Sequence, residues 1–125
     1  MLPVILPTST TAQIYLYSIP VDMRRSFDGL HSIVQAEFER DILVGDLFIF
    51  INKRGDRLKA IWWDGDGLAI FMKRLECGSF QRPASKNSDR HMLIDRVDLG
   101  LLLSGIELSS VKRRKRYQVK QTGSP

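Results

Sequence analysis

Two tight-turn signals between residues 46 and 75 constrain the fold of this chain more than any other feature. Three strand-like runs lie in this stretch, separated by the segments Lys53-Arg54-Gly55-Asp56 and Asp64-Gly65-Asp66-Gly67. Glycine supplies the positive φ that hairpin turns need. Connections this short permit antiparallel pairing only, because a parallel return needs a crossover of about a dozen residues or more. The sequence therefore predicts an antiparallel three-stranded meander over residues 46–75.

The three runs differ in their expected burial. The first contains the continuous apolar stretch Leu47–Ile51, which is typical of a strand buried on both faces. The second run alternates in part, so that Leu58, Ala60 and Trp62 share one face. Residues 68–75 run back as the third strand.

A strand and a helix are expected before the meander. The segment 13–18 is rich in β-branched and aromatic residues, which favours a strand closed by Pro20. Apolar residues then recur at spacings of three and four, which predicts one helical stripe that ends at about Glu39. The stripe consists of Phe27, Leu30, Val34 and Phe38. Asp22 or Ser26 is expected to cap this helix, because a short side-chain oxygen can accept from the free amides of a first turn.

A loop, a short strand and a short helix are expected after the meander. The polar composition of residues 78–91 predicts a loop, and residues 92–94 predict a short edge strand. Asp95 begins a pattern that resembles a capping box. Val97 and the leucines that follow then predict a short helix that Gly105 ends.

These elements together predict an α+β fold in a single domain. It comprises an antiparallel β-meander packed by one main helix, a short C-terminal helix and a basic disordered tail. The length of 125 residues matches the commonest size of one domain. We expect a flexible N-terminal arm over residues 1–12, the folded domain over residues 13–108 and the basic C-terminal tail over residues 109–125.

Several protein classes conflict with the sequence. The longest apolar run, residues 47–51, falls far short of the ~18 residues that span a bilayer, so no membrane contact is expected. Residues 1–7 lack the basic region and cleavage site of a signal peptide. Cys77 is the single cysteine, and together with His31 and His91 it makes a poor zinc site. A cytoplasmic protein is therefore expected.

The net charge of +5 comes from one end of the chain. Residues 112–125 contain six basic residues and no acid, whereas residues 1–111 contain 13 basic and 14 acidic residues. A block of like charges repels itself and stays disordered until it meets a polyanion. The expected partner of this block is nucleic acid, and the alternative is a tail that only raises solubility.

No motif in the sequence indicates catalysis. Asp64 and Asp66 place two carboxylates close together, as in some Mg²⁺ or Ca²⁺ sites, but Leu68 and Leu75 occupy positions where an EF-hand needs oxygen ligands. There is no glycine-rich phosphate loop, no zinc-protease pattern and no recognisable triad spacing. We therefore expect no catalytic residue, no metal and no cofactor, and interpret residues 64–67 as a structural turn.

Basic residues that lie near aromatic ones indicate a different chemistry. Arginine and lysine bind phosphates, and Trp62 and Trp63 are close enough in sequence to suggest base stacking on the same face. The alternative is that both tryptophans belong to the core and the bases form a solvated rim. The residues expected to bind nucleic acid are Arg24, Arg25, Lys53, Arg54 and Arg57 in the body and Lys112, Arg113, Arg114, Lys115 and Arg116 in the tail.

The same segments carry a resemblance to a known family. They are Ile14–Tyr17, Pro20–Leu30, Gly45–Asn52, Arg57–Lys59, Trp63–Leu68, Lys73–Glu76, Gly78–Phe80 and Leu101–Ile106. Collinear over roughly residues 13–108, they resemble the small accessory protein of the insertion-sequence 66 (IS 66) family, also called TnpB-type or Orf2-like. Ser26, where glycine is commoner in that family, and Arg82, where an aromatic residue is usual, depart from the pattern.

The resemblance implies a non-enzymatic accessory protein of a mobile element, needed for efficient transposition by a separate, larger transposase. Its expected partners are that transposase, other proteins of the same element and DNA. One alternative is a general nucleic-acid-binding module or regulator of the element's expression. Another is a metal-dependent nuclease that uses Asp64 and Asp66. The family supplies no catalytic residues to carry over.

Overall fold

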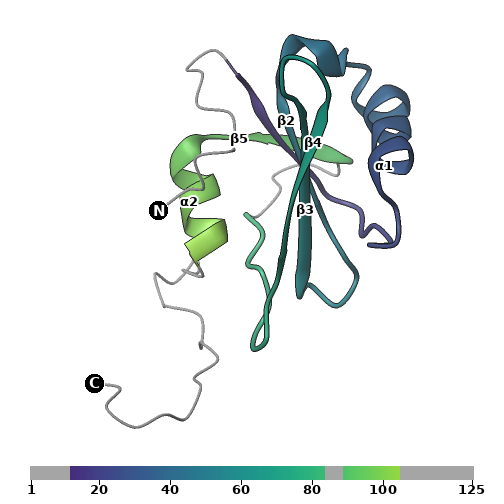
Figure 1. Ribbon diagram of the computed structural model, residues 1–125. Coiled ribbons are helices and arrows are strands. Elements are labelled where there is room, and N and C mark those ends of the chain that lie inside the picture. The colour runs from purple at the N-terminus through teal and green to yellow at the C-terminus, as the bar shows by residue number, and fades with distance from the viewer. Residues whose placement is uncertain (1–11, 84–88, 105–125) are drawn as a thin grey trace, which may run out of the picture.

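A five-stranded mixed sheet forms the centre of the structure, a computed structural model that describes residues 12–83 and 89–104. The strand order across the sheet is β4-β3-β2-β1-β5 (Figure 1). The strands are β1 (Ile14–Tyr17), β2 (Leu47–Ile51), β3 (Arg57–Trp63), β4 (Leu68–Arg74) and β5 (His91–Ile94). The predicted α+β class is confirmed. The predicted N-terminal arm up to residue 11 and the C-terminal tail lie outside the described residues.

Strands β2, β3 and β4 pair antiparallel in chain order. Gly55 and Gly65 take positive φ values of 81° and 80° in the two connecting turns, whereas Gly67 does not. These strands are only part of the sheet. β1 joins them as a parallel neighbour of β2, and β5 pairs antiparallel with β1. The long connection from β1 to β2 makes this parallel pairing possible, since it supplies the crossover that a hairpin lacks.

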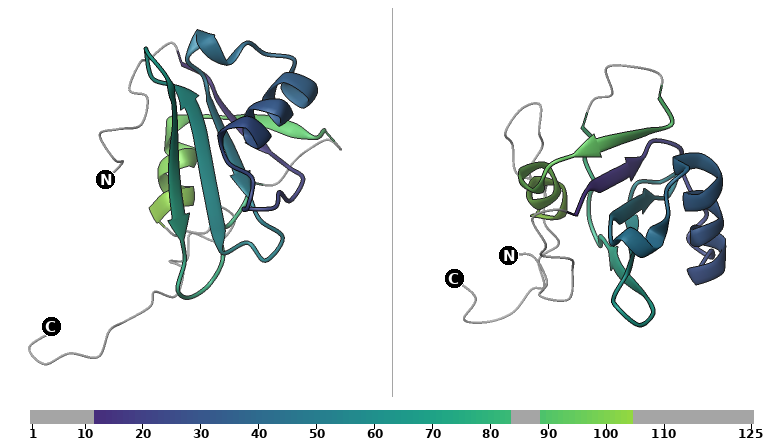
Figure 2. Two further views of the ribbon diagram at one scale, coloured as in Figure 1. Left: turned by 45° about the vertical axis from the view of Figure 1, so that its right-hand side comes forward. Right: turned by 90° about the horizontal axis from the view of Figure 1, so that it is seen from above.

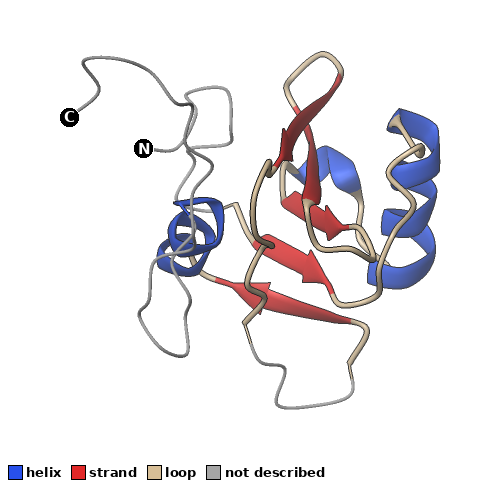
Figure 3. Ribbon diagram, turned by 90° about the horizontal axis from the view of Figure 1, so that it is seen from below, coloured by secondary structure: helices blue, strands red, loops and turns tan. Residues whose placement is uncertain are grey.

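Helical segments cover both faces of the sheet (Figures 2 and 3). On one face lies α1 (Phe27–Ile33), which continues as the π-helical segment η1 (Val34–Phe38). The short 3-10 helix η2 (Ile42–Val44) follows and leads into β2. On the other face lies α2 (Arg96–Ser104). Neither α1 nor α2, the two α-helices of the described ranges, is long and apolar enough to cross a membrane.

The α1 face of the core is largely aromatic. Leu30, Val34 and Phe38 of the predicted stripe are buried there, and the Phe38 ring lies 4.9 Å from that of Phe48. Phe27, the fourth member of that stripe, is 44% exposed, so its predicted burial is wrong. It is the first residue of α1, at the end of the stripe where the chain enters the helix. Phe48 and the rest of β2 are buried throughout, as predicted.

The predicted caps of α1 have different roles. Ser26 occupies the N-cap position but makes no side-chain capping hydrogen bond. The Asp22 carboxylate accepts from the backbone and side chain of Arg24 instead. At the far end, Glu39 takes a left-handed conformation with φ 52°, which stops the helical segment where the sequence predicts.

The α2 face of the core is mainly aliphatic. Leu99, Leu102 and Leu103 of α2 are buried against the sheet, in the same core cluster as Trp62. Asp95 caps this helix as its sequence pattern predicts, since its Oδ1 accepts from the backbone N–H of Asp98 at 2.7 Å. Val97 is 69% exposed and takes no part in the core. Gly105, the predicted stop, lies outside the described residues.

Candidate nucleic-acid interface

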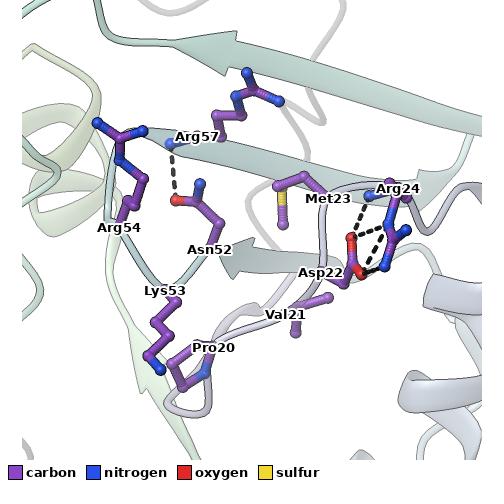
Figure 4. Close-up of a pocket in the computed structure, with 9 residues that line it drawn as sticks. All are labelled: Pro20, Val21, Asp22, Met23, Arg24, Asn52, Lys53, Arg54 and Arg57. Carbon is purple, nitrogen blue, oxygen red and sulfur yellow. Dashed lines mark hydrogen bonds and ion pairs between the residues drawn. The ribbon is translucent and has the colours of Figure 1, made fainter.

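A hollow of about 520 Å³ lies between the loop before α1 and the turn that joins β2 to β3 (Figure 4). Four cationic side chains line it, Arg24 from the loop and Lys53, Arg54 and Arg57 from the turn and the start of β3. All four residues are exposed. The remaining lining residues are Pro20, Val21, Asp22, Met23 and Asn52. The structure thus brings together four of the five basic residues that were predicted to bind nucleic acid in the body of the protein.

The side chain of Asn52 fixes the turn that carries three of these cations. Its Oδ1 accepts from the backbone N–H groups of Gly55 and Arg57, each at 3.0 Å. Its Nδ2 donates to Asp56 Oδ1 at 2.8 Å, and this hydrogen bond lowers the pKa of the Asp56 carboxyl, aided by the charges of Arg54 and Arg57. Asn52 therefore sets the backbone from which the cations project. A prediction based on charge misses Asn52, although an asparagine at the start of a turn often bonds to the backbone ahead of it.

A buried lysine fixes the opposite wall. Lys59 of β3 is only 9% exposed, and its Nζ donates to the carbonyl oxygens of Met23 at 2.9 Å and Arg25 at 2.8 Å. Val21 adds a backbone hydrogen bond to Ile51 and is itself buried. The loop before α1 is thereby tied to β2 and β3, the strands that the turn connects. The position of Arg24 relative to that turn follows from these bonds.

Asp22 is the one acid among the described residues that line the hollow, and it already forms an ion pair with Arg24. Its carboxylate accepts from Arg24 Nη2 at 2.6 Å, from Arg24 Nε and from the Arg24 backbone N–H. These hydrogen bonds lower the pKa of Asp22 from 3.8 to about 2 and raise that of Arg24. The Arg24 side chain remains 91% exposed in this pair, so it stays accessible from solvent.

Lys53, Arg54 and Arg57 have no such acidic partner. None of them forms an ion pair with a carboxylate of residues 12–83 or 89–104. Asp56 is near enough for the charges of Arg54 and Arg57 to act on it, but it forms no ion pair with either. Three exposed cations around one hollow attract an anion, because their positive potentials add. Arginine binds phosphate well through paired N–H donors.

The other residues predicted to bind nucleic acid are not among the described residues that line this hollow. Arg25 lines a neighbouring hollow of about 320 Å³ together with Tyr17 and Glu37. The tail residues from Lys112 to Arg116 lie outside the described residues. The five cations predicted in the body therefore form one main group of four and one flanking position.

The tryptophans do not form the stacking surface that the basic residues suggested. Trp62 is 2% exposed within the α2-face core, so it cannot stack on a base. Trp63 is half-buried at the end of β3. The alternative prediction, that the tryptophans belong to the core, is confirmed for Trp62. The cations also lie at the end of the sheet where β3 begins, whereas the tryptophans lie where it ends.

The turn between β3 and β4 holds its two acids at an exposed tip. The backbone N–H of Asp64 donates to the Gly67 carbonyl at 2.8 Å, and that of Asp66 donates to the Asp64 carbonyl. Within the described ranges, no group of three or more His, Cys, Asp or Glu residues is placed to hold a metal ion.

Arg82, one of the two departures from the family pattern, packs behind the hollow. Its guanidinium donates to the carbonyl oxygens of Ser18 at 3.2 Å and Asn52 at 3.4 Å, and burial lowers its pKa. It therefore joins the loop after β4 to the ends of β1 and β2. An arginine here supports the backbone of Asn52, the residue that fixes the cationic turn.

Comparison with known proteins decides the family. Residues 12–113 match the IS66 Orf2-like protein family. The chain belongs to this family. The IS66 Orf2-like match includes every residue that lines the cationic hollow, and it indicates an accessory protein associated with an insertion sequence.

Two proteins of Sinorhizobium fredii (strain NBRC 101917 / NGR234) are similar to this IS66 Orf2-like chain. The protein y4jC is 40% identical over 95 residues, which cover 76% of this chain and 80% of y4jC. The protein y4hO is 35% identical over 102 residues, which cover 82% of this chain and 87% of y4hO. Both are described only as uncharacterized. No solved structure matches the chain.

Proposed function

We propose that this protein is a non-catalytic accessory factor that supports transposition of an insertion sequence by a separate transposase, and that it does so by binding DNA. The cationic hollow is the proposed phosphate-binding surface of the body, and residues 112–116 are a second, electrostatic contact. The observation that carries the proposal is that Arg24, Lys53, Arg54 and Arg57 all line one exposed hollow, where Asp22 is the one acid among the described lining residues.

Phosphate contacts of this kind position a protein on DNA without reading its sequence. A DNA backbone that lies over the hollow would contact Lys53, Arg54 and Arg57 without displacing any ion pair of the described residues. Arg24 would exchange its exposed pairing with Asp22 for the phosphate, and an ion pair so exposed to solvent is weak. The surface therefore needs no rearrangement of the core to bind.

The salt dependence of duplex binding tests the proposal. Each phosphate contact contributes about −0.9 to the slope of log affinity against log salt. Arg54→Gln should flatten the slope by about 0.9. Removal of the tail after Val111 should flatten it by about 4–5, if four to six tail cations bind phosphates.

Arg90→Gln is the matched control, because Arg90 is an exposed arginine that pairs with Glu37 outside the hollow. Its slope should equal that of the unchanged chain. Equal slopes for the unchanged chain and Arg54→Gln would reject the hollow as a DNA contact. Equal slopes after tail removal would leave the tail as a solubilising extension.

A second candidate function, a nucleic-acid-binding module or regulator of the element's expression, shares the same surface. The two are separated by recovering the tagged protein from cells that carry the whole element, with and without nuclease treatment. Transposase that is still recovered after nuclease treatment would establish a direct protein contact and favour the accessory role. Loss of transposase together with sequence-specific binding to the element's promoter would favour the regulator.

A further inference from the structure

The two edges of the sheet differ in how far they are protected. β5 is a short edge strand of four residues, whereas β4 is an edge strand of seven residues. β4 contains no proline, and its first five residues, Leu-Ala-Ile-Phe-Met, carry no charge. Natural edge strands avoid this combination because it invites pairing with another chain. Met72 of β4 is also 48% exposed.

The hydrogen bonds at the two ends of the β3–β4 hairpin define which backbone groups of β4 face outward. Asp64 N–H donates to the Gly67 carbonyl, and Leu75 N–H donates to the Asp56 carbonyl. Hydrogen-bonded and non-hydrogen-bonded pairs alternate between these two points. The residues of β4 whose N–H and C=O groups point away from β3 are therefore Leu68, Ile70, Met72 and Arg74.

We propose that the outer edge of β4 pairs antiparallel with the same edge of a second copy of this chain, about a two-fold axis at Ile70. An isologous contact of this kind joins the two sheets into one continuous sheet. Ile70 lies opposite the partner's Ile70, and Leu68 lies opposite the partner's Met72. The backbone N–H and C=O groups of these residues point away from β3. Each opposed pair can therefore form hydrogen bonds between the two copies.

Charge complementarity favours a second copy as the occupant. One end of β4 is basic, with Arg74 cross-strand from Arg57, and the turn at its other end is acidic, with Asp64 and Asp66 exposed. An antiparallel arrangement brings the basic end of each copy to the acidic end of the other. Arg74 pairs only with Glu76 in the described chain, in a bond with both side chains at least half exposed, and such a pair exchanges easily.

The same charges select the register. With the axis at Ile70, Asp66 lies beside the partner's Arg74, an attractive contact. With the axis moved to Phe71, the outward backbone groups would still match, but Asp66 would lie beside the partner's Glu76, a repulsive contact. The apolar side chains also agree with the Ile70 axis, because Leu68 and Ile70 are half-buried and exposed Met72 gains a cover.

Disulfide cross-linking of the full chain tests the register. In a Cys77→Ser background, which removes the natural cysteine, Ile70→Cys should form a cross-linked dimer on mild oxidation. Directly opposed residues of a hydrogen-bonded pair have Cα atoms about 5.5 Å apart, within the range of about 4.4–6.8 Å that a disulfide requires. Met72→Cys in the same background is the matched control and should remain uncross-linked, because the two copies of position 72 lie on opposite sides of the axis. Absence of the Ile70→Cys dimer, or equal cross-linking at both positions, would overturn the proposal.

Sedimentation of the full chain without DNA provides the second measurement. The unchanged chain should reach twice the monomer mass as its concentration rises, and Arg74→Glu should weaken the dimer at least several-fold through two repulsive contacts. Asp66→Arg combined with Arg74→Glu should restore it, because the attraction is rebuilt with reversed signs. The proposed dimer would be contradicted if the unchanged chain stayed monomeric up to hundreds of micromolar. It would also be contradicted if the double variant dimerised no more tightly than Arg74→Glu. Neither measurement involves DNA, so both are independent of the proposed function.

Discussion

The two faces of the sheet are stabilised by different interactions. The α2 face buries mostly aliphatic side chains, and its described polar contacts lie at the ends of α2, where Asp95 caps the start and Lys73 Nζ donates to the Leu103 carbonyl. The α1 face buries an aromatic cluster in which the Phe38 ring stacks on His91 at 4.6 Å. It also contains the buried ammonium of Lys59.

The two faces have different structural tasks. The α2 face only has to exclude water, which apolar contact does without directional bonds. The α1 face also has to hold the loop of residues 20–26 against the turn of residues 53–56. The hydrogen bonds from Lys59 are directional, so they define the position of that loop more closely than apolar contacts alone would. Variants on the α2 face should therefore lower stability alone, whereas variants on the α1 face should lower both stability and DNA affinity.

Large-to-small substitutions in the two cores should have the largest effect. Leu30→Ala on the α1 face and Leu102→Ala on the α2 face each remove a fully buried side chain. Each should lower the free energy of unfolding by about 2–5 kcal/mol. Only Leu30→Ala should also weaken DNA binding under conditions where the protein is folded, because α1 follows directly from the loop of the hollow. Urea denaturation and duplex binding measure the two effects, and a similar loss of binding in Leu102→Ala would remove the distinction.

The Lys59 anchor should have the next largest effect. Lys59→Met keeps the length of the side chain but leaves the Met23 and Arg25 carbonyls without this donor, which should cost about 1–3 kcal/mol. DNA affinity should fall even though Lys59 itself is too buried to contact a phosphate. Lys53→Met is the control, since that exposed lysine should change stability by no more than about 0.5 kcal/mol. A fully stable Lys59→Met variant would show that the loop does not depend on the ammonium.

The helix cap on the α2 face should have a smaller effect. Asp95→Ala removes the acceptor for the Asp98 N–H and should lower stability by about 0.5–2 kcal/mol. The slope of DNA binding against salt should stay the same, because Asp95 lies outside the cationic hollow. Thermal melting and the binding titration test this, and an altered slope would place α2 in the DNA-binding surface.

The exposed pair of Asp22 and Arg24 should have the smallest effect on stability. The pKa of Asp22 is lowered from 3.8 to about 2, so any stability the pair contributes is present above pH 3.8 and is lost as the pH falls through about 2. Carboxyl resonances followed by NMR should give a midpoint near 2 for Asp22, and Arg24→Gln should return it toward 3.8. A midpoint near 3.8 in the unchanged chain would mean that the pair does not form in solution.

The sequence predicted the local parts of this fold because they depend on neighbouring residues. The turns that contain Gly55 and Gly65, the buried strand β2 and the cap at Asp95 all follow from patterns a few residues long. The place of β1 in the sheet does not follow from such a short pattern. β1 pairs with β2 and β5, which both lie far along the chain.

The candidate site was predictable to a similar degree. Basic residues at a turn and at a helix start were selected from their charge, and Arg24 and Arg54 do line one hollow. Lys59 has the same charge but points into the protein, where carbonyl oxygens replace water around its ammonium. Charge alone cannot separate these cases. The alternation along β3 placed Lys59 on the face opposite Leu58, and only the structure shows that α1 and its loop cover that face.

The position of β1 inside the sheet, between β2 and β5, also determines the order in which this chain can fold. The hairpins of β2, β3 and β4 join residues close in sequence, so they can form early, within the microsecond times typical of hairpins. β1 gains its second neighbour only when β5 is available, because Ile14 pairs with Ile94. β1 is the first strand to be synthesised and β5 is the last. One side of β1 therefore stays unpaired until residues 91–94 have left the ribosome. Such distant pairings slow folding, because loop closure must occur before the contacts stabilise it.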